Sequence, residues 1–198
     1  MDCLTKPDDC QGWKNFFLVL LLFMVVIPLL MSSCSNRLYR DIHEEKSVSR
    51  TEAADLRSFI KSDVEKDLDT RKVTPDLIIQ TARRYLGVPH CMGGTTEKCM
   101  GCSGLLYRVF LINGIKLPHN SEEQARYGKI IADEEKLKTG DLVFFTRTYN
   151  TKQFVTHSGI YTGNGRFIHV SSSRGVVITL IDDPWWRERY LFATRVFD

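Results

Sequence analysis

The sequence lacks several features that would place it in common functional classes. It has no large excess of either charge, since 27 lysines and arginines against 24 aspartates and glutamates give a formal net charge of +3. It also has no basic run, which argues against nucleic acid as a partner. No internal repeat or low-complexity tract is present. With 198 residues, 43% of them hydrophobic, the chain can form one domain with its own core.

The longest apolar run is too short for a comfortable transmembrane helix. It covers residues 16–31, sixteen positions, whereas a bilayer span needs about 20. The run leads through two serines into Cys34, an order that resembles a bacterial lipoprotein box. This resemblance implies a signal peptide over residues 1–33 and lipidation of Cys34. Ser35, which follows, is similar to lipoproteins sent to an outer membrane, so we expect a lipid-anchored protein of the cell envelope, facing the periplasm in a Gram-negative host. The alternative is an uncleaved N-terminal anchor.

A polar connector over residues 34–73 is expected between the anchor and the domain. Its apolar residues recur at every fourth position: Leu56, Ile60, Val64 and Leu68. Together with Ser49 and Glu52, placed as a capping box, this spacing predicts an amphipathic helix. We expect the helix to be a stalk or to lean on the domain, and not to bind a partner.

Cysteine is scarce in the expected mature chain, which would keep only Cys91, Cys99 and Cys102 apart from the lipidated residue. Three thiols exclude a disulfide framework. In an oxidising compartment, Cys91 and Cys99 can form one disulfide and leave Cys102 free. Cys99 and Cys102 also have CxxC spacing near His90, so a redox or zinc protein stays an alternative, although no second CxxC follows.

The domain is expected over residues 74–198 and begins with helices. Thr74, Pro75 and Gly87 bracket the first one. Its expected buried residues are Leu77, Ile78, Ala82 and Tyr85. A second helix should start at Cys102 and stop at Asn113-Gly114, with a core stripe of Leu105, Leu106, Val109 and Phe110.

Strands follow the helices. A short third helix is expected over residues 121–128, where Ser121 and Gln124 have capping-box spacing. Short runs rich in β-branched and aromatic residues then predict strands at 142–145, 157–162, 166–171, 176–181 and 191–197. Helices first and an antiparallel sheet of five to six strands afterwards predict an α+β fold.

Cys102 is the candidate nucleophile because a thiol at a helix N-terminus meets unpaired N–H groups and the positive end of the dipole, which favour the thiolate. Two candidate partners, His157 and His169, lie on strands joined by the turn Gly163-Asn164-Gly165. The histidines share a face of the sheet if the turn is a three-residue loop with Thr162 opposite Arg166, or if a bulge compensates. The alternative is a buried structural cysteine with two structural histidines.

The stretches around these residues resemble one family over about residues 80–196. They are RRYLGVP followed by GG, CSGLL, NGIKLP with SEEQARYG, LKTGDLVFF, HSGIYTGNGRFIHVSSS and a final RY. The chain is identified as a member of the NlpC/P60 cell-wall cysteine peptidases, which are papain-like. The resemblance implies that Cys102 is the nucleophile, His157 the general base and acid, and His169 the residue that orients it, without cofactor or metal.

Two positions depart from the family pattern. Gly101 stands where the family usually has Asp before the nucleophile, and His90 stands where it usually has Tyr. We hypothesise that His90 takes over the polar role of that Tyr near the oxyanion, beside the backbone N–H of Cys102. The other histidines, His43 and His119, are expected to face solvent.

The resemblance implies hydrolysis of an amide bond in the peptide stem of peptidoglycan, next to a diamino acid. The bond is a γ-D-glutamyl bond or a cross-link to diaminopimelate, and the sequence does not choose between them. The first alternative is a catalytically impaired module that binds peptidoglycan, and the second is the redox or zinc protein. No feature indicates an oligomeric state.

Overall fold

The computed structural model describes residue 40 and residues 50–70 and 73–197. Contacts divide the chain into two units, Met1–Arg40 and Asp41–Asp198, and every element from α2 onward belongs to the second. The expected signal peptide and Cys34 lie outside the described residues, as do His43 and Ser49. Within the described part, no helix has the length and apolar character needed to cross a bilayer.

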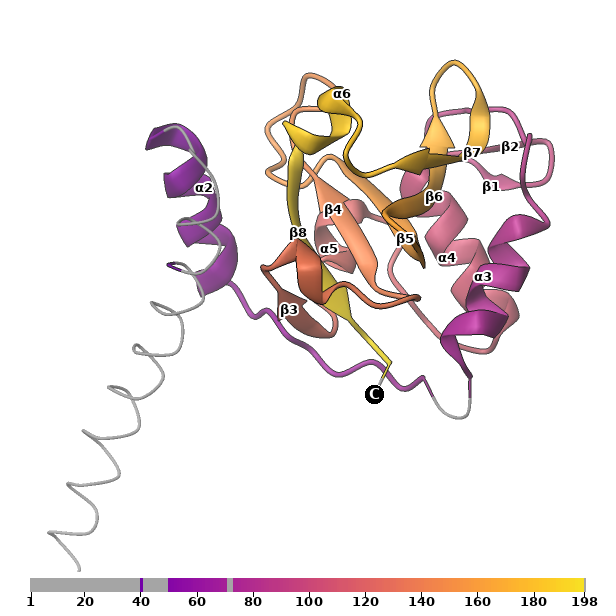
Figure 1. Cartoon of the computed structure of the whole chain (residues 1–198), viewed down its shortest axis with the longest axis horizontal. Coiled ribbons are helices and arrows are strands. Elements are labelled where there is room, and N and C mark those ends of the chain that lie inside the picture. Colours follow the sequence, from indigo (N-terminus) through magenta and orange to yellow (C-terminus); the bar gives the residue numbers. More distant parts are fainter. Residues whose placement is uncertain (1–39, 41–49, 71–72, 198) are drawn as a thin grey trace, which may run out of the picture. The chain divides into compact units, whose positions relative to one another are not determined.

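A six-stranded antiparallel sheet in the order β3-β8-β4-β5-β6-β7 carries the domain (Figure 1). Its strands are β3 Lys129–Ile131, β4 Leu142–Phe145, β5 His157–Gly163, β6 Arg166–Ser171, β7 Gly175–Leu180 and β8 Tyr190–Arg195. Five of them match the predicted strands to within two residues, and the α+β prediction is confirmed. The additional strand, β3, is only three residues long, too short to show an alternating pattern, and it forms by pairing with β8.

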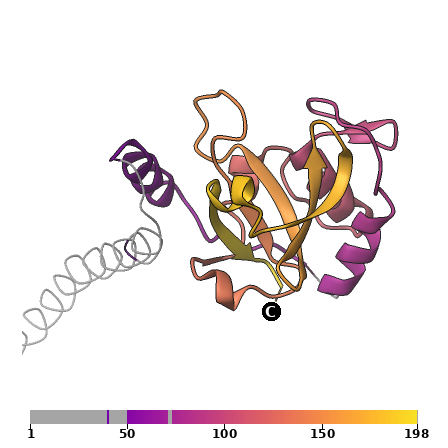
Figure 2. The same cartoon turned by 45° about the horizontal axis from the view of Figure 1, so that its top comes forward.

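Two helices, α3 (Pro75–Arg83) and α4 (Cys102–Ile112), lie side by side next to the sheet (Figures 1 and 2). The helix α4 packs on β5 and β6, and its predicted core stripe is fully buried. It ends as predicted, with Asn113 as C-cap and Gly114 at a φ of +78°. The buried apolar stripe of α4, packed against β5 and β6, therefore holds in place the helix whose first residue is Cys102.

The helix α3 begins as predicted, and Ile78, Ala82 and Tyr85 are buried as predicted, but one residue of the expected stripe is not. Thr74 caps it by accepting from the backbone N–H of Leu77 at 3.3 Å. Leu77 itself is 43% exposed, however, while Ile79 is 7% exposed and takes its expected place. Positions 77–79 are all apolar, so the pattern left the exact orientation of the helix open, and packing against α4 decides it.

The helix α2 (Arg50–Lys61) leans on the domain. Leu56 and Phe59 are buried, and the Phe59 ring lies 5.6 Å from that of Phe192 on β8. The predicted continuation through Val64 and Leu68 is wrong, because the helix ends at Lys61.

Residues 62–66 turn out of helical geometry, with Asp63 and Glu65 both at positive φ. Tertiary partners hold this path. The Glu65 carboxylate accepts from the Ile130 N–H at 2.9 Å, and the backbone N–H of Lys66 donates to the Arg126 carbonyl at 2.8 Å. Pairing with the domain therefore overrides the helical spacing of the apolar residues.

The β5–β6 hairpin uses a compensating bulge. Asn164 and Gly165, both in the left-handed region, form a two-residue turn closed by Gly163 opposite Arg166. The predicted pairing of Thr162 with Arg166 is therefore wrong. The register shifts before Gly163, so that Ile160 pairs with Ile168, as the three-residue loop would have required. The bulge puts both strand histidines on the same face, which confirms that prediction.

Candidate functional site

Cys102 lies at the N-terminus of α4, on the wall of a cavity of about 680 Å³. Its thiol is free and half-buried. The N-cap residue is Gly101, which contributes no side-chain hydrogen bond, so the helix end stays open toward the cavity. The sulfur is thus both held by a buried helix and accessible to a ligand.

Close backbone packing fixes the start of this helix. The N–H of Gly101 donates to the Gly94 carbonyl at 2.9 Å. A Cβ atom at Gly104 would lie only 1.9 Å from that same carbonyl oxygen, and one at Gly94 would lie 2.3 Å from the Cys91 sulfur. Glycine at positions 94 and 104 therefore allows the loop before α4 to touch the helix.

His157 and His169 form a hydrogen-bonded pair beside Cys102. His157 Nε2 lies 3.1 Å from His169 Nδ1, and His169 Nε2 lies 3.0 Å from Thr179 Oγ1. A His157 that accepts the thiol proton on Nδ1 carries its own hydrogen on Nε2 and donates it to His169. His169 then holds its hydrogen on Nε2 and donates to Thr179. The chain of contacts runs from β5 through β6 to β7.

Aromatic rings surround the histidine pair. The Trp186 ring lies 4.9 Å from His157 and 4.5 Å from His169, and the Phe167 ring stacks on His169 at 4.6 Å. Burial, followed by the charges of His157 and Arg174, holds the pKa of His169 well below its usual range. His169 is therefore a neutral hydrogen-bonding group. The sequence analysis missed Trp186, which lies on the short helix α6 (Pro184–Arg187).

The Cys102 thiol is acidic in this setting. Burial alone would raise its pKa. The charge of His157 acts in the other direction, as do hydrogen bonds from His157, Ser121 and the backbone of Ser158, and together they lower the pKa from 9.0 to about 6. A thiolate beside an imidazole can attack a carbonyl carbon and pass a proton to a leaving group.

A polar cluster also lies beside the sulfur. Cys102 Sγ is 3.6 Å from Ser121 Oγ, which is 3.1 Å from Ser158 Oγ. Ser121 opens the helix α5 (Ser121–Gln124), but the predicted capping box is wrong. Asn120 is the N-cap, and its side chain accepts from the backbone N–H groups of Glu122 and Glu123. The side chains of Ser121 and Gln124 are therefore available for other contacts.

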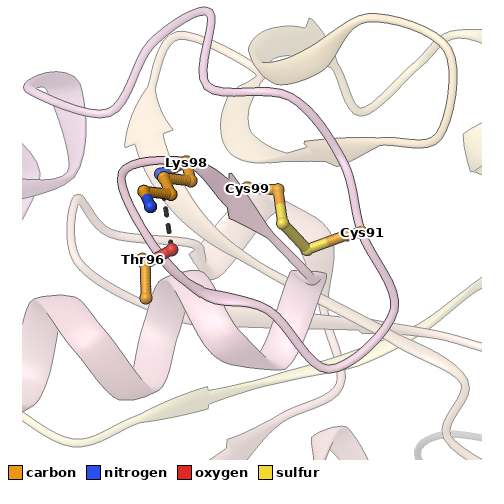
Figure 3. Close-up of a disulfide and its surroundings, with 4 residues drawn as sticks. All are labelled: Cys91, Thr96, Lys98 and Cys99. Carbon is orange, nitrogen blue, oxygen red and sulfur yellow. Dashed lines mark hydrogen bonds between the residues drawn. A yellow bond between two sulfur atoms is a disulfide. The ribbon is translucent and has the colours of Figure 1, made fainter.

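A disulfide between Cys91 and Cys99 closes the loop in front of α4 (Figure 3). The predicted pairing is confirmed, and it contradicts the alternative in which Cys99 and Cys102 form one redox or zinc-binding pair. The loop carries the two-residue strands β1 (Thr95–Thr96) and β2 (Cys99–Met100). Within residues 50–70 and 73–197, no group of three or more His, Cys, Asp or Glu side chains could hold a metal ion.

The same loop leaves little room for a side chain at Gly101. A Cβ atom there would lie 3.3 Å from the Cys91 carbonyl oxygen and 3.3 Å from the Gly93 nitrogen. An aspartate at this position would therefore require the disulfide-closed loop to move by a few tenths of an ångström. The glycine fits the loop as this chain has it.

His90 and His119 both line the cavity. His90 is half-buried and its backbone forms a bridge with Met100. His119 is exposed as predicted, with its ring stacked on Tyr107 at 5.3 Å. His90 thus lies in the same cavity as the nucleophile candidate, where the hypothesis about the oxyanion requires it to be.

Arg174 and Asp183 are the charged residues among the cavity-lining side chains of the described part, apart from the titratable histidines and Cys102. The sequence pointed to neither residue, because neither belongs to a recognisable motif and only the fold brings them to the cavity. Other basic residues serve elsewhere. Arg126, for example, donates to the carbonyl of Ser62 and forms an ion pair with Glu123 at 3.1 Å.

Comparison with known proteins agrees with this geometry. The chain is 34% identical over 174 residues to the murein DD-endopeptidase MepS/murein LD-carboxypeptidase of Escherichia coli K12, covering 87% of this chain and 89% of that one. It is 30% identical over 176 residues to the gamma-D-glutamyl-L-lysine dipeptidyl-peptidase of Bacillus subtilis, covering 88% of this chain and 55% of that one.

A solved structure and a family model point the same way. The crystal structure of an NlpC/P60 family protein from Bacillus cereus matches with a TM-score of 0.59 and 32% identity, over 65% of this chain and 42% of that one. The model of the NlpC/P60 family matches residues 87–195, which include Cys102, His157 and His169. The chain therefore belongs to the NlpC/P60 family.

Proposed function

We propose that this protein is a cysteine endopeptidase that hydrolyses an amide bond in the peptide stem of bacterial peptidoglycan. The observation that carries the proposal is a cavity lined by an acidic thiol, Cys102, and by His157, whose ring is held by a hydrogen bond to the buried His169. The relative from Escherichia coli, named a murein DD-endopeptidase, supports the substrate class because the likeness covers 89% of its length.

The first half of the reaction follows from the positions of the atoms. Cys102 gives its proton to Nδ1 of His157, the ring nitrogen not bonded to His169. The thiolate attacks the carbonyl carbon, and the backbone N–H of Cys102 at the helix start, with His90 beside it, faces the developing oxyanion. His157 then gives the proton to the leaving amine, and a thioester is left on the sulfur.

The second half releases the acid. Water replaces the amine, His157 removes its proton, and the resulting hydroxide attacks the thioester. The carbon–sulfur bond breaks, the carboxyl product leaves, and the proton held by His157 returns to the sulfur. His169 stays neutral throughout because of its buried aromatic surroundings, and it keeps the ring of His157 in one orientation.

We propose that the bond lies next to a diamino acid, either at a γ-D-glutamyl linkage or at a cross-link to diaminopimelate. Stem peptides carry free carboxylates and, at a diamino acid, an ammonium group. The cavity offers one permanent partner for each, Arg174 for a carboxylate and Asp183 for an ammonium. The two groups together favour a zwitterionic substrate over an apolar peptide.

The test is mass spectrometry of purified muropeptides incubated with the protein or with its Cys102→Ala variant. We expect new fragments whose masses identify one stem-peptide bond, and no fragments with the variant. Binding without cleavage by both proteins would instead identify a module that only holds peptidoglycan, and so would contradict the endopeptidase.

We further propose that Cys34 carries lipid and anchors the protein in the cell envelope. The support is the order of the apolar run, the two serines and the cysteine in the sequence. Metabolic labelling with a clickable palmitate analogue should mark the wild-type protein and not a Cys34→Ala variant. Equal labelling of both proteins would overturn the proposal.

A further inference from the structure

The buried amide of Gln124 fixes the direction of a hydrogen-bond chain that ends at the nucleophile. Gln124 is fully buried, and its Nε2 donates to the carbonyls of Ser103 at 2.9 Å and Pro118 at 2.7 Å. Both amide hydrogens are thereby used on oxygens that can only accept. Its Oε1 must therefore face Ser158, whose hydroxyl donates to it at 3.0 Å.

The next hydroxyl has a choice of two acceptors. Because the Ser158 hydrogen is committed to Gln124, the contact of 3.1 Å between Ser158 and Ser121 can form only if Ser121 donates. Ser121 also lies 3.6 Å from the sulfur of Cys102. Its one hydrogen can point to Ser158 or to the sulfur, and the charge on the sulfur decides between them.

We propose that the Ser121 hydroxyl is a switchable donor to the nucleophile. While Cys102 is a neutral thiol, Ser121 donates to Ser158; when the thiol proton moves to His157, the hydroxyl turns and donates to the thiolate. Gln124 is a positioning residue, because it takes the Ser158 hydrogen and leaves the Ser158 oxygen as the acceptor that competes with the sulfur. This role deepens the endopeptidase mechanism proposed above and rests on it.

The alternative role of Ser121 is only to begin α5, and the geometry speaks against it. Asn120 already supplies the capping contacts to Glu122 and Glu123, at 2.9 and 3.1 Å. Nothing in the cap requires a hydroxyl at Ser121. The hydroxyl is nonetheless buried with oxygen and sulfur as its neighbours, an arrangement that a helix start does not need.

The test measures the pH dependence of iodoacetamide alkylation at Cys102, followed by mass spectrometry, which does not depend on murein cleavage. A hydrogen bond to a charged group is strong, so Ser121→Ala should move the midpoint of the alkylation curve up by about one pH unit. At about pH 5 the variant should then react about tenfold more slowly. Ser121→Thr, which keeps the hydroxyl, should restore the wild-type midpoint.

A second variant, which should not raise the midpoint, serves if Ser121→Ala folds poorly. Ser158→Ala keeps the backbone N–H but removes the competing acceptor, so the midpoint should stay or fall. Thr81→Ala is the matched control, because it removes a buried hydroxyl that donates to the Leu77 carbonyl at 2.8 Å in α3. It should cost stability and leave the midpoint unchanged.

Two results would overturn the switch. One is an unchanged midpoint in Ser121→Ala, and the other is an upward shift in Ser158→Ala as large as that in Ser121→Ala. If the variants show the predicted midpoints but the wild-type protein cleaves no muropeptide, the result would reject the proposed function and leave the switch in place.

Discussion

The Nε2 atom of His157 lies 3.1 Å from the Nδ1 atom of His169, although the two residues are twelve positions apart on neighbouring strands. The contact depends on the bulge before Gly163, which restores the register of β5 with β6 after a two-residue turn. It leaves the other nitrogen of His157 free for the thiol of Cys102. The geometry of one turn thus controls the orientation of His157, the proposed base.

His169→Ala should lower kcat about 100-fold with little change in KM, because the ring of His157 loses the partner that fixes its orientation. Steady-state cleavage of a defined muropeptide measures both constants. Thr179→Val, which removes the hydroxyl 3.0 Å from His169, should give a smaller fall in kcat. A His169→Ala enzyme with wild-type kcat would show that His157 needs no orienting group.

The reactivity of Cys102 should follow the titration of an acidic thiol. Its pKa is lowered to about 6, and the thiolate is the nucleophile, so alkylation should rise with pH below about 7 and level off above it. An ordinary thiol keeps rising until about pH 9. His157→Ala removes the favourable charge and should move the midpoint up. Stopped-flow or quenched alkylation gives the curve, and a wild-type midpoint above pH 8 would contradict the account.

Arg174→Ala should raise KM about tenfold and leave kcat nearly unchanged, because a charge-assisted hydrogen bond to a substrate carboxylate is lost. Arg166→Ala is a suitable control. Arg166 is exposed at the start of β6, and Arg174 lies between β6 and β7, but Arg166 does not line the cavity. Kinetics on muropeptides with free and amidated carboxylates separate the effect further. Equal KM values for both variants and the wild type would remove Arg174 from substrate binding.

Replacing both Cys91 and Cys99 by serine should lower the free energy of unfolding by about 2 to 3 kcal/mol, the loop-entropy value for a separation of eight residues. Chemical denaturation measures it. The loop also carries Met92 and Gly93, which line the cavity, so KM should rise as well. Unchanged stability and unchanged KM would mean that the packing of Gly94 against α4 is sufficient without the bond.

His90→Ala should lower kcat about tenfold, if its ring N–H faces the oxyanion beside the helix start. His119→Ala is the matched comparison, because His119 lines the same cavity but stacks on Tyr107. It should affect KM and not kcat. A His90→Ala enzyme with unchanged turnover would reject the role of His90 in catalysis.

Much of the fold was predictable because local rules agree with the tertiary structure. The helix behind Cys102 has a continuous apolar stripe and clear ends, and the hairpin has a turn sequence with few geometries. The placement of His157 and His169 on the same face depends on the bulge before Gly163, one of the two geometries that the sequence allowed for it. Where three apolar residues stand in a row, as around Leu77, the sequence pattern left the buried face undecided, and packing on α4 chose Ile79.

The site was less predictable where its contacts span long sequence distances. Gln124 reaches the carbonyl of Ser103, and Trp186 covers both histidines from a four-residue helix near the C-terminus. The spacing of Ser121 and Gln124 was visible, but the local rule for it is a capping box, and Asn120 had already taken that role. Arg174 carried no motif, and only its position in the cavity identifies it.

The most direct test of the central claim follows alkylation of Cys102 and loss of muropeptide cleavage in the same sample. Iodoacetamide is added at pH 7, aliquots are quenched over time, and peptide mapping gives the labelled fraction while mass spectrometry of the products gives the remaining activity. We expect both to change with one rate constant, reaching zero activity at one label per protein. Full cleavage by protein that is completely labelled at Cys102 would contradict the account.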